Sequence, residues 1–203
     1  MLPKVIFKYS WIYDNHFKHC HSLWLKNDQK RTKYNKYPSN RQVLSYSRKV
    51  EKLWNKQEIK ILKEISNVSG LKWKVKNIDC YIVGYGIAFS DPLTISTYYK
   101  SNKFIDILTH ELIHQIFIQN FNITKKSWKY FHKKYKNKSI TTRIHIVLHA
   151  IHSKIYYRLF SFNNLNRDIR ASNSQRDYKI SWEIVNKEGY ENIINEFKER
   201  IKK

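Results

Sequence analysis

Apolar and polar residues follow two different periods along the chain. In the first third, apolar residues recur three or four positions apart, as on one face of an α-helix. This pattern predicts one helix over residues 10–31. It predicts a second, which Ser39 or Asn40 caps and which continues through Ile65 until the sequence SNVSG ends it. We therefore expect a helical layer in this part of the chain.

From Leu71 the period changes to two. The segments LKWKVKN (71–77), DCYIVGYGIAFS (79–90) and DPLTISTYY (91–99) alternate or are rich in β-branched and aromatic residues, and they predict three strands. Pro92 stands at the start of the third strand, where a missing N–H matters least. The resulting small sheet leads directly into a strongly apolar helix over residues 104–120.

The rest of the chain is mainly helical in pattern. Residues 123–138 predict a basic helix or loop, and a long helix follows with Thr141 or Thr142 as its N-cap. Residues 163–177 lack a clear period and predict a loop with a short helical piece. Two more helices follow, separated at Gly189. The fold class expected is α+β, mainly helical, with a small sheet before the apolar helix.

Length and composition are those of one globular domain. The chain has 203 residues, of which 41% are hydrophobic and 15% aromatic, so a packed core is expected rather than disorder. Neither a repeat nor a linker marks an internal boundary. We expect a single domain over residues 1–203, with a helical layer (1–69), a sheet-containing core (71–160) and C-terminal helices (161–203).

Cysteine usage and hydropathy bear on the compartment. Cys20 and Cys80 are far apart and form no C-x-x-C pair, so neither a disulfide framework nor a cysteine metal site is expected. The N-terminus does not resemble a signal peptide, and no segment has the roughly 18 to 20 apolar residues of a membrane span. A cytoplasmic protein is the expectation.

The charge is strongly positive. Lys and Arg number 39 against 16 Asp and Glu, a formal net charge of +23. Clustered cations favour nucleic acid or another polyanion as a partner, because they release counterions from phosphates. Biased amino-acid usage is the preferred explanation of the scattered lysines, because no nucleic-acid-binding motif accompanies the charge.

The sequence HELIH lies in the middle of the apolar helix. Positions four apart lie on one face of a helix, so His110 and His114 can direct ring nitrogens at one Zn²⁺ ion. Glu111 lies beside that face, where it can accept a proton from a metal-bound water. With nine histidines and nine glutamates in the chain, chance gives roughly 0.02 such patterns. The alternative is two packed histidines and a glutamate paired with a lysine.

A catalytic zinc takes three protein ligands. The next long helix offers His145, His149 and His152 on one face, and one of them is expected to be the third ligand. His149 is slightly favoured over His145, and the other would orient a ligand or stabilise an oxyanion. His152 or Tyr156, further along the same face, is a candidate oxyanion donor.

Other candidate residues carry weaker signals. Asp106 precedes His110 by one turn and could accept a hydrogen bond from a ligand, but an exposed N-terminal carboxylate is the preferred interpretation. His16 and Cys20 have the spacing of a soft-metal pair within HFKHCH, with no third partner evident. His132 is expected on the surface.

These motifs resemble the zincin superfamily of metallopeptidases, in which an edge strand precedes an H-E-x-x-H helix and a second helix bears a third ligand. They are also similar to small predicted bacterial metallopeptidases that combine S-D-P-L-T, H-E-L-I-H and T-R-x-H-x-x-x-H-A. The resemblance covers roughly residues 71–160. It implies zinc held by His110, His114 and either His145 or His149, with Glu111 as general base. It also implies that substrate main chain pairs along the strand near residues 91–97.

The chain departs from the better-defined zincin branches. HELIHQIFIQN lacks the glycine and third histidine of metzincins. The second helix has no glutamate to match gluzincins, and the H-G-x-x-F context of SprT-like proteases is absent. We expect a zinc-dependent peptidase acting on a peptide or protein. The alternative is a basic nucleic-acid-associated protein with a structural or inactive zinc site.

Overall fold

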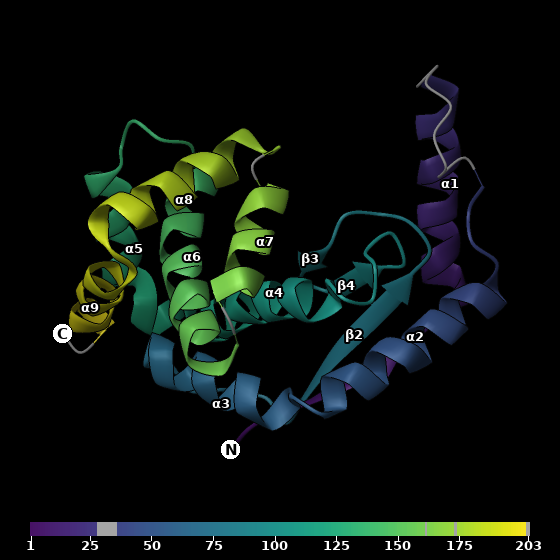
Figure 1. Cartoon of the computed structure of the whole chain (residues 1–203), viewed down its shortest axis with the longest axis horizontal. Helices are drawn as coiled ribbons and strands as arrows, with labels where there is room; N and C mark the ends of the chain where they lie inside the picture. Colours follow the sequence, from purple (N-terminus) through teal and green to yellow (C-terminus); the bar gives the residue numbers. More distant parts are fainter. Residues whose placement is uncertain (28–35, 161, 173, 202–203) are drawn as a thin grey trace. The chain divides into compact units, whose positions relative to one another are not determined.

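The computed structural model describes residues 1–27, 36–160, 162–172 and 174–201. It has an α+β fold that is mainly helical, as predicted (Figure 1). The chain forms two compact units. The sheet unit is Pro3–Glu58 with Val75–Glu111, and the helical unit is Met1–Leu2, Ile59–Lys74 and Leu112–Lys203. This division differs from the three layers expected, and the single-domain organisation stays a prediction.

The sheet has four strands in the order β1-β2-β4-β3. These are β1 (Lys4–Lys8), β2 (Asn77–Val83), β4 (Leu93–Ser96) and β3 (Phe89–Ser90). β1 and β4 both run parallel to β2, and β3 is antiparallel to β4. Strand β2, which has neighbours on both edges, begins with exposed Asn77, then alternates buried and partly buried residues, and is buried at its end.

Three strand predictions need correction, and one strand was missed. The sequence pattern did not identify β1. Residues 71–76 form no strand. The strand predicted over 79–90 is instead β2 followed by a turn and the short β3. β4 is not an edge strand over its first half, because Phe89 and Ser90 of β3 pair with it there.

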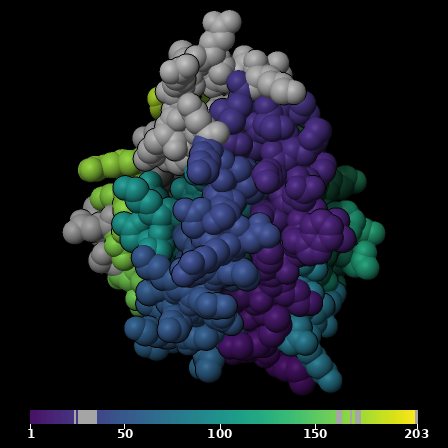
Figure 2. All heavy atoms as spheres, turned by 90° about the vertical axis from the view of Figure 1, so that its right-hand side faces the viewer, coloured from purple at the N-terminus to yellow at the C-terminus, as the bar shows by residue number. Residues whose placement is uncertain are grey.

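Two helices of the sheet unit lie before β2 in the sequence, and Figure 2 views them with α1 in purple and α2 in blue. They are α1 (Trp11–Asn27) and α2 (Asn40–Asn55), and both contact β2. Residues 28–31 of the first predicted helix lie outside the described residues. Ser39 is the N-cap of α2, and its capping box with Gln42 confirms one of the two predicted caps.

The single long helix predicted after Ser39 is two helices. α2 ends at Asn55 and α3 (Glu58–Ser69) begins three residues later. Buried Glu58 accepts hydrogen bonds from the Val5 backbone N–H and from Trp54 Nε1. The bond to Val5 attaches the start of α3 to β1. Helical periodicity does not predict this contact, because its partner lies more than fifty residues away in the sequence. The predicted end of this region is confirmed, since α3 stops at Ser69 before Gly70 in the left-handed conformation.

The helical unit gathers its helices around α6 (Figure 1), which contacts α5, α7, α8 and α9. Its core contains Leu112, Ile116, Phe131, Ile151 and Phe197, all fully buried or nearly so. Beyond residue 120 its helices are α5 (Phe121–Lys134), α6 (Ile140–Leu159), α7 (Phe162–Ser172), α8 (Arg176–Glu188) and α9 (Tyr190–Ile201).

Helix boundaries in this unit agree only partly with prediction. Ser139, not Thr141 or Thr142, is the N-cap of α6, because its side chain accepts from the Thr142 N–H. The segment expected to be mostly loop contains the eleven-residue α7. The separation of α8 from α9 at Gly189 is confirmed. None of the described helices combines the length and apolar character that a membrane span requires.

Candidate metal centre

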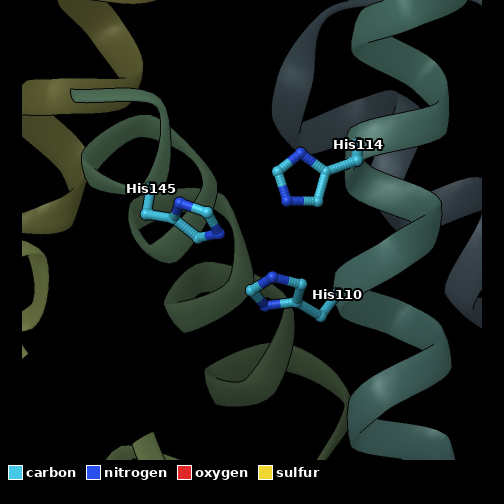
Figure 3. Close-up of side chains that lie close together, drawn as sticks. All are labelled: His110, His114 and His145. Atoms are coloured by element: carbon cyan, nitrogen blue, oxygen red, sulfur yellow. The ribbon is translucent and has the colours of Figure 1, made fainter. Parts of the chain in front are cut away.

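α4 (Phe104–Gln119) carries His110 and His114. Leu108, Leu112, Ile113 and Ile116 of this helix are fully buried, which explains why a strongly apolar sequence forms a helix here. The two histidines lie one turn apart and are partly exposed. Both rings point away from α4 in the same direction (Figure 3).

α6 contributes the third histidine of the group. The rings of His114 and His145 are 5.1 Å apart between centroids. One ligand atom from each of His110, His114 and His145 lies within 4.8 Å of the others, so the three side chains could hold a metal ion. Figure 3 shows the three rings converging from two helices. His145, rather than the slightly favoured His149, lies with this pair, and which of the two binds a metal stays a prediction.

A hydrogen bond on the far side of its ring orients His145. Its Nδ1 lies 2.8 Å from the carbonyl oxygen of Thr141, one turn earlier on α6. A carbonyl only accepts, so Nδ1 carries the proton and Nε2 keeps its lone pair. A metal-binding histidine commonly has this arrangement, in which the second nitrogen fixes the tautomer and the ring direction.

Burial keeps His114 and His145 neutral. It lowers the pKa of His114 to about 3, with a smaller contribution from the nearby His145. It also lowers the pKa of His145 to about 4, against the opposing effect of the bond to Thr141 and the charge of Asp177. Both rings therefore offer lone pairs rather than protons at neutral pH, which is the form that binds a metal.

Glu111 is buried, with 7% of its surface exposed. Burial raises the pKa of its carboxyl to about 8. Its charge in turn helps to raise the pKa of Cys80 on β2 and of Tyr99, so these two groups are its electrostatic neighbours. Among the described residues no lysine or arginine forms an ion pair with Glu111, which speaks against the alternative of a structural salt bridge.

His149 is fully engaged with α8. Its ring stacks on Trp182 at 4.0 Å and 6°, and its Nδ1 lies 2.8 Å from Ser181 Oγ. Burial lowers the pKa of His149 well below the ordinary value, with His145, His152 and His114 contributing. The His149 ring lies 5.4 Å from that of His145 on the same helix, so its contacts with α8 help to hold the part of α6 that carries His145.

The two candidate oxyanion donors lie elsewhere on α6. His152 is fully buried and packs against Tyr156 at 4.6 Å. Tyr156 belongs to an apolar cluster with Leu165 and Trp182. It lies eleven residues beyond His145, about 16 Å along the helix axis. The structure does not bring Tyr156 to the metal group.

α8 supplies neighbours that the sequence did not identify. The Tyr178 ring lies 4.2 Å from that of His145, and Ser181 and Trp182 contact His149. Their spacing along α8 is that of one helical face, which predicts a buried stripe without naming its partner. Cys80 and Tyr99 near Glu111 were also missed, because their approach to Glu111 depends on tertiary packing.

The weaker candidates lie outside the group. Asp106 is buried at 5% exposure, so the expectation of an exposed carboxylate was wrong. His16 Nε2 and Cys20 Sγ are 3.7 Å apart on the exposed side of α1. His132 is partly buried and stacks on Trp128, rather than lying on the surface as expected.

Comparison of the chain with known protein families, with characterised proteins and with solved structures found no match. The zincin resemblance therefore rests on the residues quoted for it. What stands independently of that resemblance is the geometry: three histidines from α4 and α6 converge, and a buried carboxyl follows the first of them in sequence.

Proposed function

We propose that the protein is a zinc-dependent metallopeptidase. The observation that carries the proposal is the convergence of His110, His114 and His145, which provides the three protein ligands typical of a catalytic zinc. Glu111, adjacent to the first ligand, would be the general base. The substrate class is a peptide or a protein.

The donor set fits zinc in number, chemistry and protonation. Three nitrogens bound to one Zn²⁺ at about 2.0–2.1 Å stand about 3.4 Å apart. The nitrogens here are within 4.8 Å of one another, so small side-chain movements suffice. Neutral imidazole is a common ligand of Zn²⁺, and a three-histidine set leaves one position for water or substrate.

Zinc held there would act as a Lewis acid that polarises the scissile carbonyl and makes a water more acidic. Glu111 would accept the proton from that water and deliver it to the leaving amine. In the metal-free protein its pKa of about 8 means that the carboxyl is largely protonated at neutral pH. The positive charge of a bound cation favours the ionised form, which is the one that accepts a proton.

Metal content tests the site. We expect elemental mass spectrometry of the purified protein to find about one zinc per chain, with loss in His110→Ala and His145→Ala. His149→Gln is the matched control, because it changes a neighbouring histidine on the same helix and should retain zinc. Loss of zinc in His149→Gln with retention in His145→Ala would assign the third ligand to His149. Absence of zinc from the wild type after loading would refute the site.

Glu111→Gln tests the chemistry separately from metal binding. This variant should keep its zinc and lose peptidase activity by about 10²- to 10⁴-fold, the usual contribution of a general base. The assay follows cleavage of a quenched-fluorescent peptide library, with His132→Gln as a control outside the group. A zinc-loaded Glu111→Gln protein with wild-type activity would rule out this role for Glu111.

A further inference from the structure

The segment from Leu112 to Arg167 contains eleven Lys and Arg and no Asp or Glu. Much of this charge is concentrated on α5 and the loop after it. The exposed cations there are Lys125, Lys129, Lys133, Lys136 and Lys138, which we call the lysine face, with exposed Lys126 beside them.

Three members of the lysine face, Lys125, Lys129 and Lys133, lie on the solvent side of an amphipathic helix. Thr124, Ser127 and Phe131 form the buried side of α5. Lys129 and Lys133 lie on the opposite side, at the helical spacing of four. From Lys125 to Lys133 the row spans about 12 Å at the helical rise, a length along which one DNA strand has about three to four phosphates.

Local carboxylates do not neutralise the lysine face. Glu188 and Glu196 approach α5 from α8 and α9, and both bind Lys134, which is not part of the face. Tyr135 also donates to Glu188. Within the described part of the chain, no carboxylate forms an ion pair with any of the five lysines of the face.

The loop that ends the lysine face is held in place by a cation from α6. Arg143 donates from Nε to the carbonyl of Lys138, 2.8 Å away, and from a terminal nitrogen to the carbonyl of Lys136, 2.6 Å away. These bonds fix the backbone that carries both lysines. The lysines are thus displayed on a fixed backbone, while the positive charge of Arg143 is used within the fold.

We infer that the lysine face is a binding surface for the phosphate backbone of nucleic acid. A row of exposed cations without local counter-charges attracts a polyanion and releases its counterions on binding. A helix that lies in a membrane surface presents an extended apolar face to the lipid. α5 uses that face to pack on α9, where Ser127 donates to the Phe197 carbonyl and Trp128 lies 5.5 Å from the Phe197 ring. Only Phe121 and Ile123 of α5 are exposed apolar residues.

The inference is independent of the proposed metal site, and a salt-dependent binding assay tests it. The full chain is titrated into a fluorescein-labelled mixed-sequence oligonucleotide of about 20 nucleotides, at about 50 to 300 mM KCl. Fluorescence anisotropy should show binding that weakens steeply with salt. Substituting Lys125, Lys129 and Lys133 by Gln together should lower the affinity about tenfold or more and reduce the salt slope by about 2 to 3.

The control changes the same amount of charge elsewhere. Lys56, Lys60 and Lys63 are exposed at the end of α2 and on α3, and their replacement by Gln should leave the affinity nearly unchanged. Equal loss in both triple variants would overturn the inference, since the charge would then act diffusely. It would also be overturned if the wild type bound only anionic phosphatidylserine vesicles. Chelator and His145→Ala should not alter oligonucleotide binding, whereas both abolish the proposed peptidase activity.

Discussion

At the residue scale, the contact between His149 and Ser181 gives a direct test of how α8 supports α6. Ser181 Oγ donates to the Tyr178 carbonyl, so it accepts the proton of His149 Nδ1. Ser181→Ala removes the acceptor of a buried N–H, which should cost about 1–3 kcal/mol in the free energy of unfolding. Urea unfolding followed by circular dichroism measures this change.

Ser153→Ala is the matched control for that substitution. Ser153, on α6, is buried like Ser181, but its hydroxyl donates only to the carbonyl of His149, four residues before it. That carbonyl remains in the helix hydrogen-bond pattern, so its loss should cost much less. Both variants should keep their zinc. If Ser153→Ala were as destabilising as Ser181→Ala, the His149 bond would not be the cause.

The same residues show what spacing along the sequence can and cannot predict about a site. His110, Glu111 and His114 are local to one helix, so their spacing alone indicates a shared metal. His145, His149 and His152 share one helix face and are equivalent by periodicity. The packing of α6 distinguishes them. The His149 ring stacks on Trp182 of α8, whereas the His145 ring lies beside that of His114. That choice is a property of tertiary packing.

At the element scale, the start of α2 offers a second prediction. The Ser39 side chain accepts from the Gln42 N–H, and the Gln42 side chain accepts from the Ser39 N–H. Ser39→Ala should therefore lower the free energy of unfolding by about 1 kcal/mol. Ser45→Ala, an exposed change within the same helix, should be neutral or slightly stabilising because alanine favours helix. Thermal unfolding of the two variants beside the wild type measures the difference.

Elements with local causes were predictable, and elements with distant partners were not. Ser39 and Gly70 mark helix ends through nearby bonds. The alternation in 71–76 correctly buries Leu71 and Trp73. However, main-chain groups of this segment bond to side chains at the end of α4 and just after it, not to a neighbouring strand. The Lys74 N–H donates to the Gln119 side chain, and the Asn120 side chain donates to the Lys72 carbonyl. The strand at Lys4–Lys8 has its partner more than seventy residues away, and five residues alone do not indicate it.

At the scale of the whole molecule, charge and burial separate the two proposed activities. Burial keeps His114 and His145 of the metal group neutral, whereas the lysine face consists of exposed ammonium groups. Chelators act on the first and leave the second unchanged. Salt screens the second, since exposed charges interact over about 10 Å or less at 0.1 M ionic strength, and has little effect on bonds between a metal ion and neutral ring nitrogens.

Acid stability is the last prediction and concerns the folding equilibrium of the chain. Burial lowers the pKa of His152 from 6.5 to about 3. The unfolded chain binds this proton as the pH falls below 6.5, while the folded chain does not. The contribution of a neutral His152 to stability is therefore present above pH 6.5 and is lost progressively between 6.5 and 3. Between about pH 7.5 and pH 5.5 the loss is about 1.4 kcal/mol.

A variant without the titrating ring should show a shallower dependence. Urea unfolding of wild type and His152→Gln, both with chelator, should give free energies of unfolding whose difference shrinks by about 1.4 kcal/mol on going from about pH 7.5 to pH 5.5. His19→Gln is the control, because His19 is exposed on α1 and meets water in both states. Parallel curves for wild type and His152→Gln would show that the buried ring takes up its proton without unfolding, and that acid sensitivity arises from other groups.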